Sequence, residues 1–132
     1  MTRWLLVVVA AACASAPPEP PAKSAQLNRP GEAVSVEAAL VDDHVTVVDF
    51  WSESCAACVI VTGMIAVQIA NEPRIIVRKV DVGDGFTPVA RAYKISTLPH
   101  VNIYDRKRRL RYVLIANECL RAPDLARELL RE

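Results

Sequence analysis

Residues 45–58, V-T-V-V-D-F-W-S-E-S-C-A-A-C, determine the fold expected for this chain. β-branched and aromatic residues form a run that contains one acid, Asp49, and a short polar loop then leads to two cysteines separated by two alanines. A near-continuous apolar run predicts a strand with both faces covered. The order of strand, turn and Cys-x-x-Cys predicts a redox-active pair.

The spacing of Cys55 and Cys58 suits thiol–disulfide chemistry. Two intervening residues at the start of a helix place both sulfurs on one turn, where they close a small disulfide ring. Free backbone N–H groups and the helix dipole favour the thiolate at Cys55, and the thiolate is the species that attacks a disulfide. Cys58 lies one turn further along and is expected to be more shielded, so that it resolves the mixed disulfide by attacking Cys55.

Asp49 is the only acid in the predicted strand. A carboxylate in a buried strand is costly unless it is paired or protonated. We therefore expect a raised pKa and a role in proton transfer. In the alternative interpretation, Asp49 lies at the exposed end of the strand and caps the loop.

These residues resemble the thioredoxin family, in which an Asp-Phe-Trp run leads to Cys-Gly-Pro-Cys-Lys. The resemblance implies that Cys55 is the nucleophile, that Cys58 is the resolving thiol and that Asp49 is the buried acid beneath it. The chain differs from the family pattern around the pair, where it carries Ser54, Ala56, Ala57 and Val59. These differences bear on the reduction potential and on the surface offered to partners.

Residues 96–104, S-T-L-P-H-V-N-I-Y, extend the resemblance. Thioredoxin-like domains carry a cis proline just before the third core strand, facing the cysteines, and Pro99 stands in that place. The resemblance implies that Leu98 offers its backbone to a bound substrate chain, so Trp51, Leu98 and Pro99 are the expected substrate-binding residues. The alternative is an ordinary trans proline at the start of a strand.

Residues 1–13 predict export. Arg3 precedes the apolar run 4–12, which is far too short to span a bilayer and is typical of a secretory signal peptide. Residues 10–13, A-A-A-C, resemble a bacterial lipoprotein cleavage box, so Cys13 is the expected lipidation site; ordinary cleavage after residues 14–16, A-S-A, is the alternative. Lipidation implies a protein anchored in the bacterial periplasm or cell envelope.

The rest of the chain is divided into a tether and one domain. Residues 14–31 are proline-rich and predict an extended tether. Residues 32–132 have the size of a single domain. Their pattern alternates strands and helices, and with the resemblance it predicts an α/β thioredoxin-like fold, with a central mixed sheet of about four strands flanked by helices. The predicted helices cover residues 35–41, 55–71, 87–93 and 123–130, and the predicted strands cover 45–51, 74–82, 100–104 and 110–115.

Several residues remain outside this scheme. Cys119 is expected to be a buried inert thiol, with a mixed disulfide or a dimer as the alternative. His44 and His100 are expected to be structural, although His100 is also a candidate neighbour of the sulfurs. Residues 105–109, D-R-K-R-R, predict a solvated turn, with weak attraction to anionic headgroups as the alternative. The helix after Cys55 is apolar on nearly every side, so most of its apolar residues are expected to be core, with an apolar docking rim for a partner at Val59 and its neighbours as the alternative.

The expected function is thiol–disulfide exchange with protein thiols and disulfides, more as a reductase, because an acid like Asp49 accompanies reducing members of the family. The cysteine pair carries the electrons, so no cofactor or metal is expected, and a membrane or soluble electron donor or acceptor completes the cycle. Without the signal, 15 acidic residues balance the basic ones, which gives no reason to propose nucleic acid. Two other hypotheses are Cu(I) binding by the pair with His100, and a non-catalytic adaptor with a structural disulfide.

Overall fold

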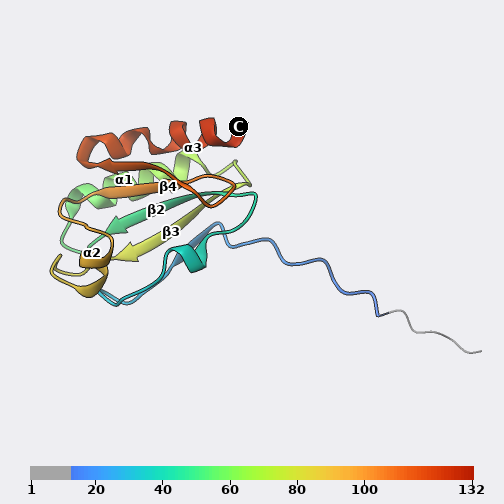
Figure 1. Cartoon of the computed structure of the whole chain (residues 1–132). Helices are drawn as coiled ribbons and strands as arrows, with labels where there is room; N and C mark the ends of the chain where they lie inside the picture. Colours follow the sequence, from blue (N-terminus) through green and yellow to red (C-terminus); the bar gives the residue numbers. More distant parts are fainter. Residues whose placement is uncertain (1–12) are drawn as a thin grey trace, which may run out of the picture.

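One mixed sheet of five strands forms the centre of the chain in the computed structural model, which describes residues 13–132 (Figure 1). The strand order is β1-β3-β2-β4-β5; β3 is parallel to β1 and β2, whereas β4 is antiparallel to β2 and β5. The predicted α/β architecture is confirmed, with one strand more than expected. The strands are Ser24–Gln26 (β1), Val45–Trp51 (β2), Ile75–Asp81 (β3), His100–Tyr104 (β4) and Leu110–Ile115 (β5).

Helices cover both faces of the sheet (Figure 1). The helices α1 (Ala56–Gln68) and α3 (Ala122–Arg131) pack on one face, and the 3-10 helix η2 (Ala116–Arg121) leads into α3. The opposite face is covered by α2 (Pro88–Ala92) and by the segment around the 3-10 helix η1 (Glu37–Ala39). Each face therefore has its own apolar cluster, and β2 contributes alternate residues to both.

Short-range signals in the sequence predicted two elements correctly, β2 and α2. Residues 45–50 of β2 are all buried, as the apolar run predicts for a strand with helices on both faces. Thr87 caps α2 by accepting a hydrogen bond from the backbone N–H of Ala90 at 3.4 Å, and Pro88 takes the first helical position.

The predicted tether over residues 14–31 is wrong in its last part, because Ser24–Gln26 pairs with β3 as an edge strand. The Lys23 ammonium donates to the carbonyl oxygen of Ile75 at 2.7 Å, and the Gly31 N–H donates to the carbonyl oxygen of Asp81 at 3.0 Å. Gly31 has a φ of +74°, and a Cβ there would lie 2.5 Å from Cγ2 of Thr87. Backbone groups and the Lys23 side chain hold this segment to the sheet, and an apolar sequence pattern does not predict such contacts.

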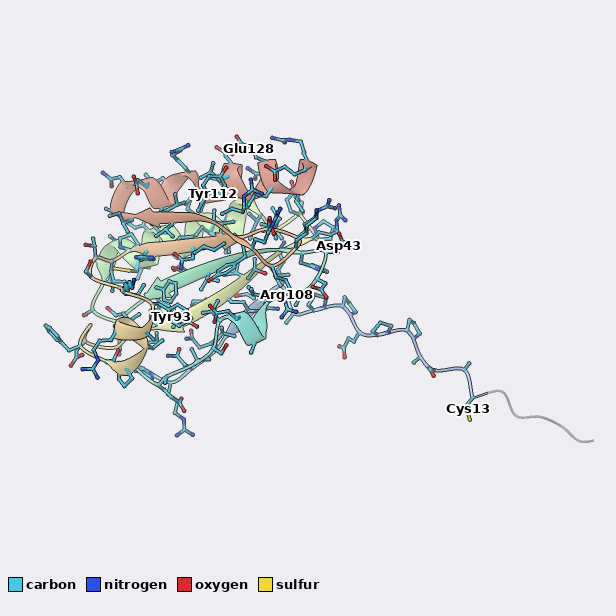
Figure 2. The ribbon with its side chains drawn as sticks, in the orientation of Figure 1. Cys13, Asp43, Tyr93, Arg108, Tyr112 and Glu128 are labelled. Carbon is cyan, nitrogen blue, oxygen red and sulfur yellow. A yellow bond between two sulfur atoms is a disulfide. The ribbon has the colours of Figure 1, made fainter. Side chains whose placement is uncertain are left out.

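The extended chain before Ala22 leaves the domain at one end of the sheet, and Cys13 lies well beyond that end (Figure 2). Residues 1–12 of the predicted signal peptide lie outside the described residues. Within residues 13–132, no helix combines the length and the apolarity needed to cross a membrane.

The basic turn between β4 and β5 is neutralised by acids. Asp43 pairs with Arg106 at 3.3 Å and Asp105 pairs with Arg109 at 2.7 Å. Arg108 lies 3.9 Å from Asp42. This pairing weakens the alternative of attraction to anionic headgroups and favours a solvated turn.

Candidate active site

The two cysteines of the motif form a disulfide at the start of α1. Their Cα atoms are 5.3 Å apart, and Cys55 is the N-cap residue of the helix. The sulfur of Cys55 accepts a hydrogen bond from the backbone N–H of Cys58 at 3.1 Å. Cys55 is half-buried, whereas Cys58 is 1% exposed. The structure thus confirms the expected pairing and the expected difference in shielding.

Asp49 is fully buried on the face of β2 that α1 covers, so the alternative in which it lies at an exposed strand end is wrong. The Thr62 hydroxyl of α1 donates to Oδ2 of Asp49 at 2.5 Å. Oδ1 is the only buried side-chain oxygen or nitrogen atom without a hydrogen-bond partner among the described residues. Burial raises the pKa of Asp49, and the Thr62 hydrogen bond and the charge of Lys79 oppose this rise.

Thr62 and Lys79 interact with Asp49 and were not among the predicted site residues. One signal was available, because Thr62 follows Cys58 by four residues and therefore lies on the same side of α1. Lys79 is opposite Asp49 in the pairing of β2 with β3, which only the sheet register shows.

The peptide bond between Leu98 and Pro99 is cis, so the alternative of a trans proline is wrong. The carbonyl oxygen of Pro99 accepts a hydrogen bond from the backbone N–H of Ala116 at 3.0 Å. The Cys119 thiol lies 3.5 Å from the same oxygen. Residues of η2 therefore contact and stabilise the loop that contains Pro99, which we call the proline loop.

Two hollows flank this loop. One of about 510 Å³ is lined by Cys55, Phe86 and Leu98, among other residues. The other, of about 300 Å³, is lined by Ile60, Leu98, Pro99 and Leu120, among other residues. Leu98 lines both hollows, and Phe86 (85% exposed) and Ile60 (69% exposed) add apolar surface to their rims. The structure therefore brings the cysteine motif, Leu98 and Pro99 together at a partly apolar surface.

Trp51, the third expected substrate-binding residue, lies toward β1. Its indole N–H donates to Oε1 of Gln26 at 3.2 Å, and the Lys79 ammonium lies 4.7 Å from the centre of its ring. Trp51 does not line either of the two hollows described above. Its place depends on β1, the strand that the sequence analysis did not predict.

His100 is structural, as expected. Its ring packs edge-on against Phe50 with centroids 5.4 Å apart, and Nε2 lies 3.0 Å from Oδ1 of Asn102. Burial lowers the pKa of His100. The ring lies on the α2 side of the sheet, whereas Cys58 lies on the α1 side, so His100 does not complete a copper site. Among the described residues, no three His, Cys, Asp or Glu side chains form a group that could hold a metal ion.

Cys119 is fully buried, and its sulfur lies 3.4 Å from the carbonyl oxygen of Leu114. Burial, and next the charge of Asp49, raise the pKa of this thiol to about 11. A buried thiol with a high pKa is inert. The structure thus supports the expected inert thiol over a disulfide with another chain.

The comparisons with known proteins agree with this geometry. The family model described as Thioredoxin matches residues 32–121, and no curated protein sequence matches the chain. Three similar solved structures show the same fold. A Schistosoma mansoni thioredoxin pre-protein has a TM-score of 0.64 and 21% identity, over 82% of this chain and 99% of that chain. Thioredoxin O2 from Arabidopsis thaliana has a TM-score of 0.57 and 16% identity, over 67% of this chain and 76% of that chain, and the germline-specific thioredoxin Deadhead from Drosophila melanogaster has a TM-score of 0.54 and 24% identity, over 71% of this chain and 87% of that chain. With the family match and the Cys55–Cys58 pair, the chain belongs to the thioredoxin family of thiol–disulfide oxidoreductases.

Proposed function

We propose that this chain exchanges disulfides with exported protein partners, and that it does so more as a reductase. The observation that carries the proposal is the environment of Cys55. Cys55 is half-buried, lines a hollow and lies at the N-terminus of α1, and its sulfur accepts a hydrogen bond from the Cys58 N–H, an arrangement that favours a thiolate in the reduced protein.

The reaction is a pair of exchanges. The Cys55 thiolate attacks a substrate disulfide, so that a mixed disulfide forms and one substrate sulfur leaves as a thiolate. Asp49 then takes the proton of the Cys58 thiol, and the Cys58 sulfur attacks Cys55. The second substrate thiolate leaves, and two electrons have passed from the cysteine pair to the substrate. A membrane or soluble electron donor reduces the Cys55–Cys58 disulfide again.

A partner chain would bind across the proline loop. Leu98 lines both hollows, and Cys55 lines one of them with it, so an extended segment that pairs with the Leu98 backbone would lie near the cysteine pair. The apolar rim formed by Val59, Ile60 and Phe86 supplies contact area for a partner and does not select partners by their charge.

We further propose export and a lipid anchor at Cys13. The sequence of residues 1–13 supports this proposal, as does the extended chain between Cys13 and the domain (Figure 2). That chain enters where β1 begins, whereas the cysteine pair follows the opposite, carboxyl end of β2. An anchored domain would therefore present its disulfide away from the membrane. Labelled fatty acid should be incorporated by the full chain in a bacterial host and not by Cys13→Ala; equal labelling of both would overturn the anchor.

The reduction potential of the pair tests the exchange and its direction. The measurement uses a glutathione or dithiothreitol series on the chain without its signal and with Cys119→Ala, with Cys55→Ser as the control that lacks the couple. A reversible two-electron transition near about −270 mV supports a reductase, and one near about −120 mV would make the chain an oxidant of exported proteins. If no reversible couple exists, the exchange is overturned and the adaptor hypothesis takes its place.

A further inference from the structure

A threonine of α1 contacts the buried acid of β2. Thr62 donates its hydroxyl hydrogen to Oδ2 of Asp49 at 2.5 Å. This is the only side-chain hydrogen bond that Asp49 makes among residues 13–132, and Oδ1 has no partner there. The two carboxylate oxygens are therefore not equivalent, because one is occupied and the other is free to accept a proton.

The position of Thr62 relates this contact to the resolving cysteine. Thr62 and Cys58 are four residues apart in α1, so their side chains leave the same side of the helix. That side covers β2, and Cys58 is only 1% exposed. The proton of the Cys58 thiol thus has little access to solvent, and a carboxylate beneath the same helix face can accept this proton in place of water.

Thr62 also borders a hollow of about 220 Å³ between α1 and the β1–β3 pair. Lys23, Ser24 and Lys79 are among the residues that line this hollow, and Asp49 is not. The Thr62 side chain therefore lies between the carboxylate and a hollow whose lining is mostly apolar, but which is partly open to solvent and large enough for a water molecule. Removing that side chain would let water reach Asp49, whereas an isosteric apolar side chain would keep water out.

We propose that Thr62 is a positioning residue for the exchange reaction: it holds Oδ2 of Asp49, stabilises the carboxylate form and leaves Oδ1 as the acceptor of the Cys58 proton. This inference rests on the proposed function. In the step, the S–H bond of Cys58 breaks and an O–H bond forms at Oδ1. The Cys58 sulfur then bonds to Cys55, and the Cys55–substrate bond breaks to release the substrate thiolate.

The other charged or titratable groups near Asp49 are few. Lys79 on β3 lowers its pKa, and Cys119 on η2 interacts with its charge. Cys58 on α1 is held in the disulfide and does not titrate in the oxidised protein, and β4 and α3 contribute apolar residues to this cluster. A change at Thr62 therefore alters one hydrogen bond and leaves these charges in place.

The test compares four variants in the oxidised, full-length protein by carboxyl-carbon NMR titration of Asp49. Thr62→Val should raise the pKa of Asp49 by about one pH unit, because a hydrogen bond to the charged form is lost. Thr62→Ala should raise it less, since water can enter from the hollow, and Thr62→Ser should restore the original value. Thr46→Val is the matched control, because Thr46 is buried in the same strand on the opposite face.

The second readout is the pH dependence of the resolving step, measured by stopped flow on a preformed mixed disulfide at Cys55. Its rising limb should move to higher pH in Thr62→Val by the same shift that NMR reports, and Thr62→Ser should restore it. Equal titrations in Thr62→Val and Thr62→Ser, or a shifted titration with an unchanged kinetic profile, would overturn the role of Thr62. The NMR titration needs no partner, so loss of exchange in the unsubstituted protein would instead overturn the proposed function.

Discussion

At the scale of single residues, Asp49 opposes the stability of the domain at neutral pH. Its carboxyl group is fully buried and one oxygen lacks a partner among the described residues, so folding disfavours the charged form. A raised carboxyl pKa costs nothing below the pKa of the unfolded chain, near about 4, and costs most above the folded-state pKa. The stability of the protein should therefore fall as the pH rises through the pKa of Asp49.

We predict that Asp49→Asn increases the free energy of unfolding at pH 7 by about 1–3 kcal/mol, because the uncharged amide is cheaper to bury and its oxygen still accepts from Thr62. Urea unfolding of the oxidised proteins at pH 7 and pH 3.5 measures the difference. The gain should shrink at pH 3.5, where the carboxyl of the original protein is protonated. Equal stabilities at pH 7 would contradict the prediction.

Cys119 is the other residue whose environment determines its chemistry. Its thiol is fully buried and its pKa is about 11, so it exposes no thiolate to a reagent at pH 8. Iodoacetamide should therefore leave Cys119 unmodified in the oxidised native protein and label it in guanidinium chloride, as read by mass spectrometry. Cys13, which is exposed, should be labelled under both conditions when it carries no lipid. Native labelling of Cys119 at the rate of Cys13 would show that η2 opens readily.

At the scale of elements, α1 presents an apolar surface to solvent beside the disulfide. Val59 is 69% exposed next to the cysteine motif, and Val67 is 77% exposed two turns further along. The two valines differ in their distance from Cys55 along the helix and little in exposure. They therefore provide a matched pair for the docking rim.

We expect Val59→Lys to lower kcat/KM for protein disulfides about tenfold, because a valine-sized contact is replaced by a charge that must be desolvated. Val67→Lys should stay within about twofold of the original value. Turnover of a small disulfide such as glutathione disulfide, which is too small to reach the rim, should be similar for both variants. Unchanged turnover of every protein partner by Val59→Lys, or an equal loss in Val67→Lys, would contradict the docking rim.

Asp105 contacts both the backbone and the side chains of the turn between β4 and β5. Asp105 accepts hydrogen bonds from the backbone N–H groups of Lys107 at 2.9 Å and Arg109 at 3.0 Å, and its Oδ2 also pairs with Arg111 at 3.3 Å. Burial raises the pKa of Asp105, but the hydrogen bonds from Arg109, Lys107 and Arg111 outweigh burial and lower the pKa to about 2. A depressed carboxyl pKa contributes stability above the unfolded pKa, and that contribution is lost as the pH falls toward 2.

Asp105→Asn should therefore lower the free energy of unfolding by about 1–2 kcal/mol at pH 7, and the difference should disappear near pH 2. Urea unfolding across this pH range measures it. Asp42→Asn is the control, because the Asp42 side chain is 84% exposed and its one ion pair is long, at 3.9 Å. A difference between Asp105→Asn and the original protein that persists at pH 2 would assign the effect to packing and not to charge.

At the scale of the whole molecule, the sequence was sufficient to predict an element or a motif wherever one strong local pattern determines it. The apolar run of β2, the Cys-x-x-Cys motif and the Thr87-Pro88 start of α2 each carry their own signal, and all three were predicted. Contacts that depend on how elements pack were missed. Thr62 meets Asp49 only because α1 crosses β2 at that point, and Trp51 lies beside Gln26 only because β1 is present.

The boundary of the domain is the largest error of the sequence interpretation, and β1 explains it. The carbonyl oxygen of Lys23 accepts from the N–H of Val77 at 2.8 Å, and the N–H of Leu27 donates to the carbonyl oxygen of Lys79 at 2.9 Å. Asn28 adds a side-chain hydrogen bond to the carbonyl oxygen of Asp81 at 2.9 Å. This segment covers the edge of β3, which would otherwise expose unpaired backbone groups.

We predict that a chain beginning at Ala22 is as stable as one beginning at Ala14, whereas a chain beginning at Glu32 loses at least about 2 kcal/mol of unfolding free energy. The loss follows from several hydrogen bonds at about 0.5–1.5 kcal/mol each. Urea unfolding of the three oxidised chains measures it, and hydrogen exchange should show faster exchange at the N–H of Val77 only in the shortest chain. Equal stability of the chains beginning at Ala22 and Glu32 would mean that β1 rests on the sheet without stabilising it, and that the functional domain begins near residue 32 as the sequence analysis expected.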